Sequence, residues 1–513
     1  MCVTWEVSAT LGGNGIDGRP VERLSGLDAA FLALETAATH LHVGAVMVFA
    51  PGEAGLDFEV LRQMVLDRLH LVPPFRRRAV RVPFGLHHPL WLEDPEFDID
   101  YHLRRASLPG PGGLRELTAF VADQMGRPLD PDRPLWEMHM VEGLDSGHVA
   151  LIAKIHHAMI DGVSGAELLR AFFDLAPDGE CPGPPAPAWS PERVPGEVDL
   201  VLQAVSSLVR QPEAVVSTLR ETFHAAVHLA ERRRRIVEED ELDPPPAPFG
   251  APRTSLNGSI SPHRRFSCAE SSLDQVRNTA RLLGATVNDV VLAAVGGALR
   301  RLLVERGEKL ADSLVAMVPV STRSGGDQGG PANRVSAMLV SLATDVESPE
   351  ERLAVIAQGS RLAKQDAELV TGRLIAGWAG IALPAVSARA ARLVSNLRVF
   401  DHLPPVCNVV VSNVAGPDIP LWCAGGRLVA VYPVGPVADG VGLNVTVFSY
   451  MGQLFLGLLG CRELVPEISD LAIYIVDSLA ELDKAARRAA PRHPYQACPE
   501  RDSNPHAPKG KGF

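Results

Sequence analysis

The clearest pattern of apolar and polar positions lies in the first half of the chain. "WEMHMVEGL" (136–144) alternates apolar and polar residues, "HVALIAKI" (148–155) repeats the alternation, and Asp145-Ser146-Gly147 between them has the composition of a turn. This pattern predicts a β-hairpin. "GAELLRAFFDL" (165–175) follows with helical spacing, so residues 156–164 are expected at a strand-to-helix junction.

Similar periodicity predicts elements on both sides of a Pro-rich interruption. A helix over 285–307 is expected to begin with Thr286 as N-cap and Asp289 in a capping-box-like position. Met451-Gly452 is expected to turn between the last two strands. A short helix at 24–35 and a C-terminal helix at 466–488 are also predicted, with strands at 42–50, 333–344, 408–414, 426–434, 442–450 and 453–459.

These elements predict an α/β (α+β) protein in two halves. Residues 1–20 are Gly-rich and expected to be disordered, 21–175 form an N-terminal domain, and 256–488 form a C-terminal domain. Between them, the Pro-rich segments "APDGECPGPPAPAWSPERVPG" and "DPPPAPFGAP" flank a helical stretch, which predicts a crossover linker over 176–255. Residues 489–513 are a polar, Pro-rich tail that is also expected to be disordered.

Composition narrows the class of protein. With 513 residues and 46% hydrophobic residues the chain can bury large cores, and its net charge of −12 disfavours a nucleic-acid binder. The seven cysteines are scattered without a C-x-x-C motif, as is typical of reduced thiols. We see no signal peptide and no run of eighteen apolar residues, so a cytoplasmic protein is expected, with association to a membrane surface left open.

The predicted junction contains "KIHHAMIDGVSG" (154–165), which gathers His156, His157, Asp161 and Gly162. A shared metal is disfavoured, because neighbouring side chains on a strand point to opposite faces and no third ligand lies nearby. A hydrogen-bonded structural histidine remains an alternative interpretation. The third interpretation is general base catalysis, in which one imidazole accepts a proton while its neighbours hold the turn.

HHxxxDG resembles the signature of acyltransferases similar to chloramphenicol acetyltransferase, including the condensation domains of peptide synthetases. Further stretches narrow the match to the bacterial wax ester synthase/diacylglycerol acyltransferase family. This resemblance covers about residues 20–485, and the stretches that carry it are "RLSGLDAAFLALE", "HLHVGAVMVF", "RPLWEMHMVEGL", "PRTSLNGSISPHRRF", "TVNDVVLAAVGGALR", "VPVSTRSGG" and "NVVVSNVAGP".

The resemblance implies roles for individual residues of the motif. His157 would be the proton acceptor, and His156 would help to place it. Asp161 would be a structural carboxylate paired with an arginine that the sequence does not identify. Gly162 would leave room for the backbone at the turn.

Three further segments match family motifs, each with an ordinary structural alternative. The Pro134-Leu135-Trp136 stretch is associated with acyl binding, but it also suits a hydrophobic entry to a strand. The Asn-Asp pair supports activity from the second domain, although on sequence alone plain helix capping is the favoured explanation. The SNVAGP segment offers oxyanion donors, or merely polar groups at a strand end. The residues concerned in the last two segments are Asn288, Asp289, Ser412 and Asn413.

The resemblance also implies a fold and a reaction. Two chloramphenicol-acetyltransferase-like domains, each a mixed sheet flanked by helices, would place the site at their interface. Acyl-CoA would donate its acyl group to diacylglycerol or a long-chain alcohol, with no metal and no cofactor. A membrane or lipid-droplet surface is an expected partner, through an apolar stripe near 219–227 or the segment 373–384. The alternatives are a non-catalytic lipid-binding homologue and a condensation-type enzyme that uses carrier-protein thioesters.

Overall fold

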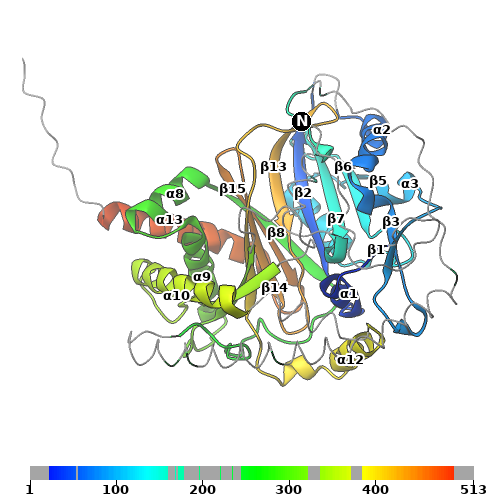
Figure 1. The fold of residues 1–513 in the computed structure, drawn as a ribbon. Helices are drawn as coiled ribbons and strands as arrows, with labels where there is room; N and C mark the ends of the chain where they lie inside the picture. Colours follow the sequence, from blue (N-terminus) through cyan, green and yellow to red (C-terminus); the bar gives the residue numbers. More distant parts are fainter. Residues whose placement is uncertain are drawn as a thin grey trace, which may run out of the picture.

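The computed structural model describes residues 22–52, 56–159, 171–177, 244–321, 335–370 and 384–489, with isolated positions at 168, 179, 196, 220, 231 and 234. Two six-stranded sheets, each mixed in strand direction, form the centre of the molecule (Figure 1). Most of the predicted linker, including nearly all of its predicted helix, lies outside the described residues. The mixed α/β class expected from the sequence is confirmed.

The first sheet carries the predicted β-hairpin. Its strands pair antiparallel except for β5 and β6, which are parallel. The hairpin of β6 and β7 is confirmed, and β7 lies in the interior of the sheet between β2 and β6. In spatial order the strands are β12 (Trp422–Cys423), β13 (Gly426–Val434), β2 (His42–Ala50), β7 (Val149–His156), β6 (Trp136–Glu142) and β5 (Leu103–Ser107).

The second sheet is built from the second half of the chain. β11 pairs parallel with both β9 and β14, and the remaining pairs are antiparallel. The predicted turn at Met451-Gly452 is confirmed, and both residues have positive φ. In spatial order the strands are β10 (Val335–Ser341), β9 (Val315–Ser321), β11 (Val409–Ala415), β14 (Leu443–Tyr450), β15 (Gln453–Cys461) and β8 (Arg264–Ser272).

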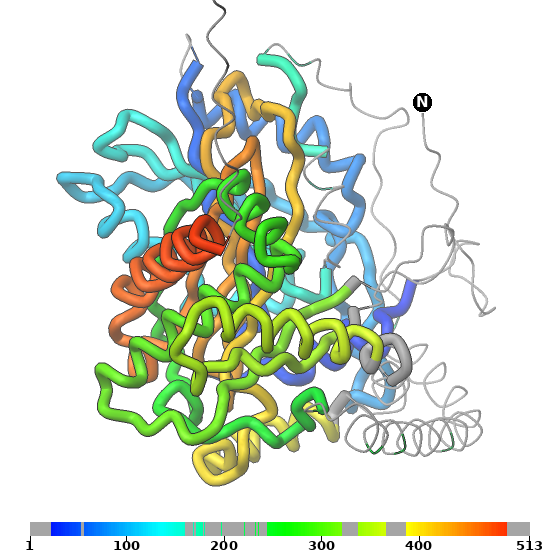
Figure 2. Tube along the Cα trace, turned by 90° about the vertical axis from the view of Figure 1, so that its left-hand side faces the viewer, coloured from blue at the N-terminus to red at the C-terminus, as the bar shows by residue number. Residues whose placement is uncertain are grey.

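A layer of helices covers one face of this second sheet. Figure 1 shows the layer on the left of the sheet, and Figure 2, viewed from that side, shows α10 and α13 side by side in front of the strands. The apolar residues of α9 form the centre of the largest hydrophobic core together with β9, β11 and β14. The helices of the layer are α8 (Leu273–Leu282), α9 (Val287–Glu305), α10 (Pro349–Val370) and α13 (Ile468–Ala489).

Smaller elements surround the first sheet. The helix α1 packs against both α12 and the short 3-10 helix η4 that follows β7. A three-stranded sheet consists of β1 (Glu22–Arg23), β4 (Leu90–Glu93) and β3 (Arg77–Val80). The helices are α1 (Gly26–Ala33), α2 (Phe58–Arg68), α3 (Ile99–His102), α4 (Leu114–Met125) and α12 (Pro384–Asn396), with 3-10 helices η1 (Leu69–Leu71), η2 (Pro73–Arg76), η3 (Pro83–Gly85), η4 (His157–Met159) and η5 (Val399–Asp401).

Two strands of the second half belong to the first sheet. β13 pairs antiparallel with β2, in a register that runs from Arg427 opposite Ala50 to Val434 opposite Gly44. β12 then pairs with β13 at the edge. A division of the chain near residue 255 therefore separates the sequence motifs but not the sheets.

The two sheets approach each other closely where β13 meets β15. A Cβ atom on Gly457 would lie 1.7 Å from the carbonyl oxygen of Pro433, so only glycine fits at this point. Beside it, Tyr432 donates a hydrogen bond to Glu270 of β8, and its ring packs edge-on against Phe455 at 5.5 Å. This contact fixes the second sheet against the strand that completes the first.

A buried ion pair secures the chain segment at residues 171–174 to the first domain. Arg68, which is 2% exposed, donates to the Asp174 carboxylate at 2.6 Å. The backbone of Asp174 exchanges two hydrogen bonds with Trp422 of β12. The segment that follows the HHxxxDG motif is thus joined to the helix α2 of the first half of the chain and to the strand β12 of the second half.

Among the described residues, no single helix is both long and apolar enough to cross a membrane. Only α8 and α9 taken together reach that length and composition, across a bend of 98°.

We expect Gly457→Ala to separate the two sheets locally, because the added methyl group overlaps the Pro433 carbonyl group. Overpacking against backbone predicts a loss of about 3 kcal/mol in the free energy of unfolding, measured by urea titration. Gly359→Ala in α10 is the matched control, since nothing lies within 4 Å of its Cβ position. The control is expected to be neutral or slightly stabilising. Equal unfolding midpoints for both variants would contradict the proposed sheet contact.

Candidate active site

The two motif histidines lie where β7 ends. His156 is the last residue of β7, and His157 is the first residue of η4, as the sequence predicted for a strand exit. Their backbone N–H groups donate to Leu135 at 2.9 Å and to Leu41 at 2.8 Å. The N–H of Ala158 donates to Nδ1 of His156 at 3.0 Å. Three hydrogen bonds therefore hold the turn in one conformation.

The two histidines differ in their exposure to solvent. His156 is 0% exposed, whereas His157 is only partly buried. The ring of His157 packs against Phe31 of α1, with ring centroids 4.5 Å apart. Of the two rings, only that of His157 is partly exposed, whereas His156 is enclosed by the protein.

A carboxylate and two further histidines surround His156. Glu35, just after α1, places Oε1 3.2 Å from Nε2 of His156 and 3.7 Å from Nε2 of His42. His42 is paired with His156 across β2 and β7, and the ring of His40 stacks on that of His42 at 5.5 Å. Burial, with Lys154 nearby, holds the pKa of His42 well below its ordinary value, so this imidazole is neutral.

The same face of the first sheet continues with charged and polar side chains. Lys154 is 1% exposed, and its Nζ lies 3.2 Å from a carboxylate oxygen of Glu137 on β6. It also donates to the carbonyl oxygens of Gln124 and Arg127. Burial lowers the pKa of Lys154, while the Glu137 carboxylate opposes this shift. The buried Lys154–Glu137 pair depends on all of these hydrogen bonds, because a buried charge without a partner lowers the stability of the fold.

The Pro134-Leu135-Trp136 stretch lies beside the end of β7 and supports the histidine turn. Trp136 is fully buried, and its indole N–H donates to the carbonyl oxygen of Phe75 at 2.8 Å. His102 hydrogen-bonds the Trp136 carbonyl oxygen through Nδ1 and stacks on the indole ring at 4.5 Å. Because Leu135 accepts the His156 N–H, this segment positions the end of β7.

Two sequence models cover most of the chain. The wax ester synthase/diacylglycerol acyltransferase catalytic domain matches residues 24–291, and the C-terminal domain of the same family matches residues 332–483. The chain belongs to this family. The HHxxxDG turn described above lies within the catalytic-domain match.

Relatives match over nearly the whole length. A Mycobacterium tuberculosis protein that bears the provisional name diacylglycerol O-acyltransferase is 36% identical over 484 residues, which is 92% of this chain and 98% of the relative. The wax ester synthase/diacylglycerol acyltransferase from Marinobacter aquaeolei VT8 superposes with a TM-score of 0.63 at 30% identity, covering 91% of this chain and 100% of that one.

The fold extends beyond the family. The starter condensation domain of rhizomide synthetase superposes with a TM-score of 0.54 at 13% identity, over 91% of this chain and 95% of that chain. The first condensation domain of the calcium-dependent antibiotic synthetase gives 0.53 at 17% identity, over 92% and 97%. These likenesses confirm the two-domain fold that the HHxxxDG resemblance implied.

The other residues predicted from family motifs are distributed over the molecule. Asp161 and Gly162 lie outside the described residues. Asp289 is buried at the start of α9 and caps that helix, where its carboxylate accepts from the N–H and hydroxyl groups of Thr286. Asn288 precedes it on the same helix, in the layer that covers the second sheet. Their contribution to acyl transfer stays a prediction, because capping accounts for the contacts of Asp289.

The two predicted oxyanion donors lie together on β11. Ser412 is half-buried opposite Thr446, and Asn413 is exposed opposite Val447. β11 is an interior strand of the second sheet, and its last residues are exposed. Their proposed role in holding an oxyanion stays a prediction.

Sequence reasoning missed Glu35 and His42 as parts of the site. Their signals were a glutamate at the end of a short helix and a histidine at the start of the next strand. Neither pattern is specific. The pairing of β2 with β7 places His42 opposite His156, and Glu35 reaches both rings from the end of α1. The four cysteines among the described residues, in contrast, are free and buried as the sequence suggested.

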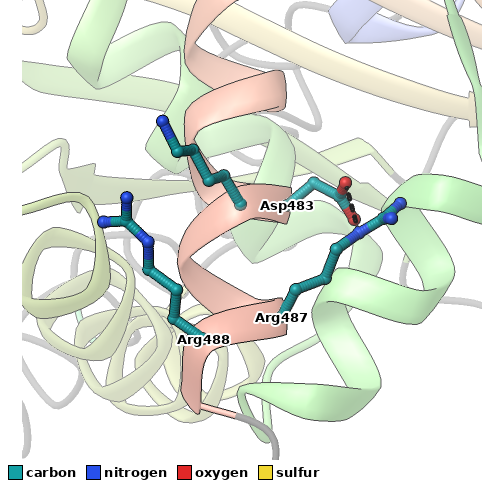
Figure 3. Close-up of a pocket in the computed structure, with 4 residues that line it drawn as sticks. Asp483, Arg487 and Arg488 are labelled. Atoms are coloured by element: carbon teal, nitrogen blue, oxygen red, sulfur yellow. Dashed lines mark ion pairs between the residues drawn. The ribbon is translucent and has the colours of Figure 1, made fainter.

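A separate surface pocket of about 650 Å³ lies near the end of α13, lined by Asp483, Lys484, Arg487 and Arg488 (Figure 3). Arg487 pairs with Asp483 at 2.8 Å, so part of its charge is already balanced. The pocket belongs to the helix layer of the second sheet and includes neither motif histidine. The candidate active site is therefore the histidine turn and not this pocket.

We expect acid to destabilise the protein through His139 of β6. Burial lowers the pKa of His139 to about 4, whereas an unfolded histidine titrates near 6.5. Between these values the unfolded chain binds a proton that the folded chain does not, so stability falls as the pH falls through this window. At pH 5 the loss should reach about 1–2 kcal/mol after allowance for solvent screening.

Urea unfolding at pH 7 and pH 5 measures this loss. His139→Gln removes the titrating group and should reduce the difference between the two pH values. His263→Gln changes an exposed histidine and should keep the difference of the unmodified protein. If all three proteins lose the same stability at pH 5, His139 is not responsible.

Proposed function

We propose that this chain transfers a long-chain acyl group from acyl-CoA to the hydroxyl group of diacylglycerol, and also to long-chain alcohols, with His157 as general base. Family membership and relatives named for this activity support the reaction class. The observation that carries the residue assignment is the contrast between a fully buried His156 and a partly exposed His157 in one hydrogen-bonded turn.

In the proposed reaction, the imidazole of His157 accepts the proton of the attacking hydroxyl group as its oxygen bonds to the thioester carbon. The tetrahedral intermediate then collapses, the carbon–sulfur bond breaks, and the imidazolium returns the proton to the CoA thiolate. Atoms and charges balance without a covalent acyl-enzyme, a metal or a cofactor. A positioned general base typically contributes about 10² to 10⁴ in rate.

The remaining predicted residues take supporting roles in this proposal. Ser412 or Asn413 would donate a hydrogen bond to the oxyanion. Asp161 and Gly162 would shape the turn after His157. Pro134, Leu135 and Trp136 would form a wall near the acyl chain, and Asn288 and Asp289 would maintain the start of α9.

Two other functions are less well supported. A condensation enzyme would use carrier-protein thioesters, but the likeness to condensation domains at 13–17% identity supports the fold alone. A non-catalytic lipid-binding protein would not need an accessible imidazole on a rigid turn. Acyl transfer onto purified diacylglycerol separates these functions, because each predicts a different donor or no turnover.

We also propose that α12 brings the enzyme to an anionic lipid surface. Val386 and Leu393 of α12, and Leu397 just after it, are each about 60% exposed. The spacing of Val386 and Leu393 places both on one face of the helix. The exposed Arg389 and Arg392 lie on the same helix, a combination typical of interfacial helices. Since α12 packs against α1, which contacts His157, a lipid acceptor would have a short path to the turn. Except for Arg220 and Pro384, the two segments that the sequence suggested for this role lie outside the described residues.

The first test is CoA release from palmitoyl-CoA with diacylglycerol or hexadecanol as the acceptor. We expect His157→Ala to lower kcat by about 10² to 10⁴ while the protein stays folded. His263→Ala, which alters an exposed histidine, should retain the activity of the unmodified protein. Equal rates for the unmodified protein and His157→Ala would reject His157 as the base. If the proteins bind acyl-CoA but none of them releases CoA, the lipid-binding alternative is favoured.

Co-sedimentation with vesicles tests the role of α12. Binding to phosphatidylglycerol vesicles should exceed binding to phosphatidylcholine vesicles, and Leu393→Glu should weaken it by about tenfold through lost apolar contact and added repulsion. Val304→Glu is the control, because Val304 is 55% exposed on the distant helix α9. Equal binding of the two variants would exclude α12 as the contact surface.

A further inference from the structure

Glu35 is the carboxylate that contacts the buried histidines behind the proposed base. It follows the C-terminal end of α1, and its side chain is 29% exposed, while those of His42 and His156 are 1% exposed. One oxygen, Oε1, lies within ion-pair distance of Nε2 of both rings, at 3.7 Å and 3.2 Å. The carboxylate therefore reaches from the end of α1 into the paired strands β2 and β7.

The hydrogen bonding of His156 determines which of its nitrogens carries a proton. The N–H of Ala158 donates to Nδ1, so this nitrogen is an acceptor. In a neutral ring the proton is then on Nε2, the nitrogen that faces Glu35. Nε2 makes no other hydrogen bond among the described residues, although the contact with Glu35 is not aligned as one in this conformation.

This tautomer bears directly on the turn that holds His157. A retautomerised His156 would present an N–H to the N–H of Ala158, and a flipped ring would present a C–H. Either change would remove the hydrogen bond from η4 to His156. Ala158 directly follows His157, so the position of the base depends on the ring that Glu35 contacts. The helix α1, which precedes Glu35, also supplies Phe31, whose ring packs on that of His157.

The loop that carries Glu35 is itself held in place. The hydroxyl oxygen of Thr36 accepts hydrogen bonds from the backbone N–H groups of Ala38 and Thr39. Arg264, from β8 of the second sheet, donates to the carbonyl oxygen of Ala38. Glu35 is thus positioned by contacts from both sheets before any substrate binds.

We propose that Glu35 is a positioning residue for acyl transfer, which accepts a hydrogen bond from the Nε2–H of His156 and so holds the turn that carries His157. This inference rests on the proposed function of His157. Glu35 does not touch the reacting atoms, and its effect passes through His156 and Ala158. A purely structural ion pair would stabilise the fold without controlling the tautomer of His156, and this difference separates the two roles.

Three variants at position 35 test the proposal kinetically. Glu35→Leu removes the acceptor and should lower kcat by about 10²-fold, with KM changed by less than about twofold, since a small misplacement of a catalytic group has effects of this size. Glu35→Gln keeps an acceptor oxygen and should restore much of kcat. Glu35→Asp keeps the charge on a shorter side chain and should be intermediate. Glu59→Gln, on the exposed part of α2, is the matched control and should be unchanged.

A spectroscopic measurement tests the tautomer without relying on turnover. In protein labelled with ¹⁵N-histidine, the ring resonances of His156, assigned through His156→Asn, should show the Nε2–H tautomer in the unmodified chain. Glu35→Leu should shift them towards a mixture of tautomers while thermal unfolding shows a folded protein. Because this readout needs no acyl transfer, it remains decisive even if the proposed reaction fails.

Several results would overturn the proposal. The first is a kcat for Glu35→Leu within about twofold of that of the unmodified enzyme. The second is a Glu35→Gln variant as slow as Glu35→Leu. The third is a His156 tautomer that stays the same in Glu35→Leu. A loss of kcat in Glu35→Leu that follows only from unfolding would also reject it, since then the carboxylate contributes stability alone. Equal CoA release by the unmodified protein and His157→Ala would instead reject His157 as the general base, which is the proposed function and not the role of Glu35.

Discussion

The pairing of β13 with β2 is the constraint on which the arrangement of the site depends. β2 is hydrogen-bonded on one side to this strand from the second half of the chain and on the other to β7, which ends in His156. The motif strand is therefore an interior strand, and neither of its edges is free to move. The Gly457 contact then fixes the second sheet against β13, so the position of the turn is determined by both sheets at once.

The polar face of the first sheet explains why so many ionisable groups are buried around one turn. Lys154, Arg264, His40 and His42 would together make this region strongly positive if all were charged. Burial lowers the pKa of Lys154 and of both histidines, and the carboxylates of Glu137 and Glu35 lie among them. Desolvation and pairing thus act together, so that neutral imidazoles can exist beside a lysine.

Much of the local structure could be predicted from sequence, because apolar alternation and capping residues act over a few positions. The β6–β7 hairpin, α9 with its Thr286 cap, and the strands β10, β11, β13, β14 and β15 are confirmed. β8 was missed because it is an edge strand with Arg265 and Glu270 among its apolar residues, which obscures the alternation. The membership of β13 in the first sheet could not be predicted, since alternation reveals a strand but not its partner. Glu35 was missed for the same reason, because 121 positions separate it from His156 and no local pattern joins them.

The insertion of β12 and β13 into the first sheet also constrains how relatives can be recombined. A chimera joined at the Pro-rich region would place β2 from one parent beside β13 from another, and the ladder from Arg427 to Val434 would have to match across that new junction. A chimera designed to exchange acyl-acceptor specificity between family members would therefore work best when residues 422–434 come from the same parent as the first half of the chain. Substitutions in β2 and β13 are expected to accumulate together over evolution, as they do within one folding unit, even though 375 residues of chain lie between the two strands.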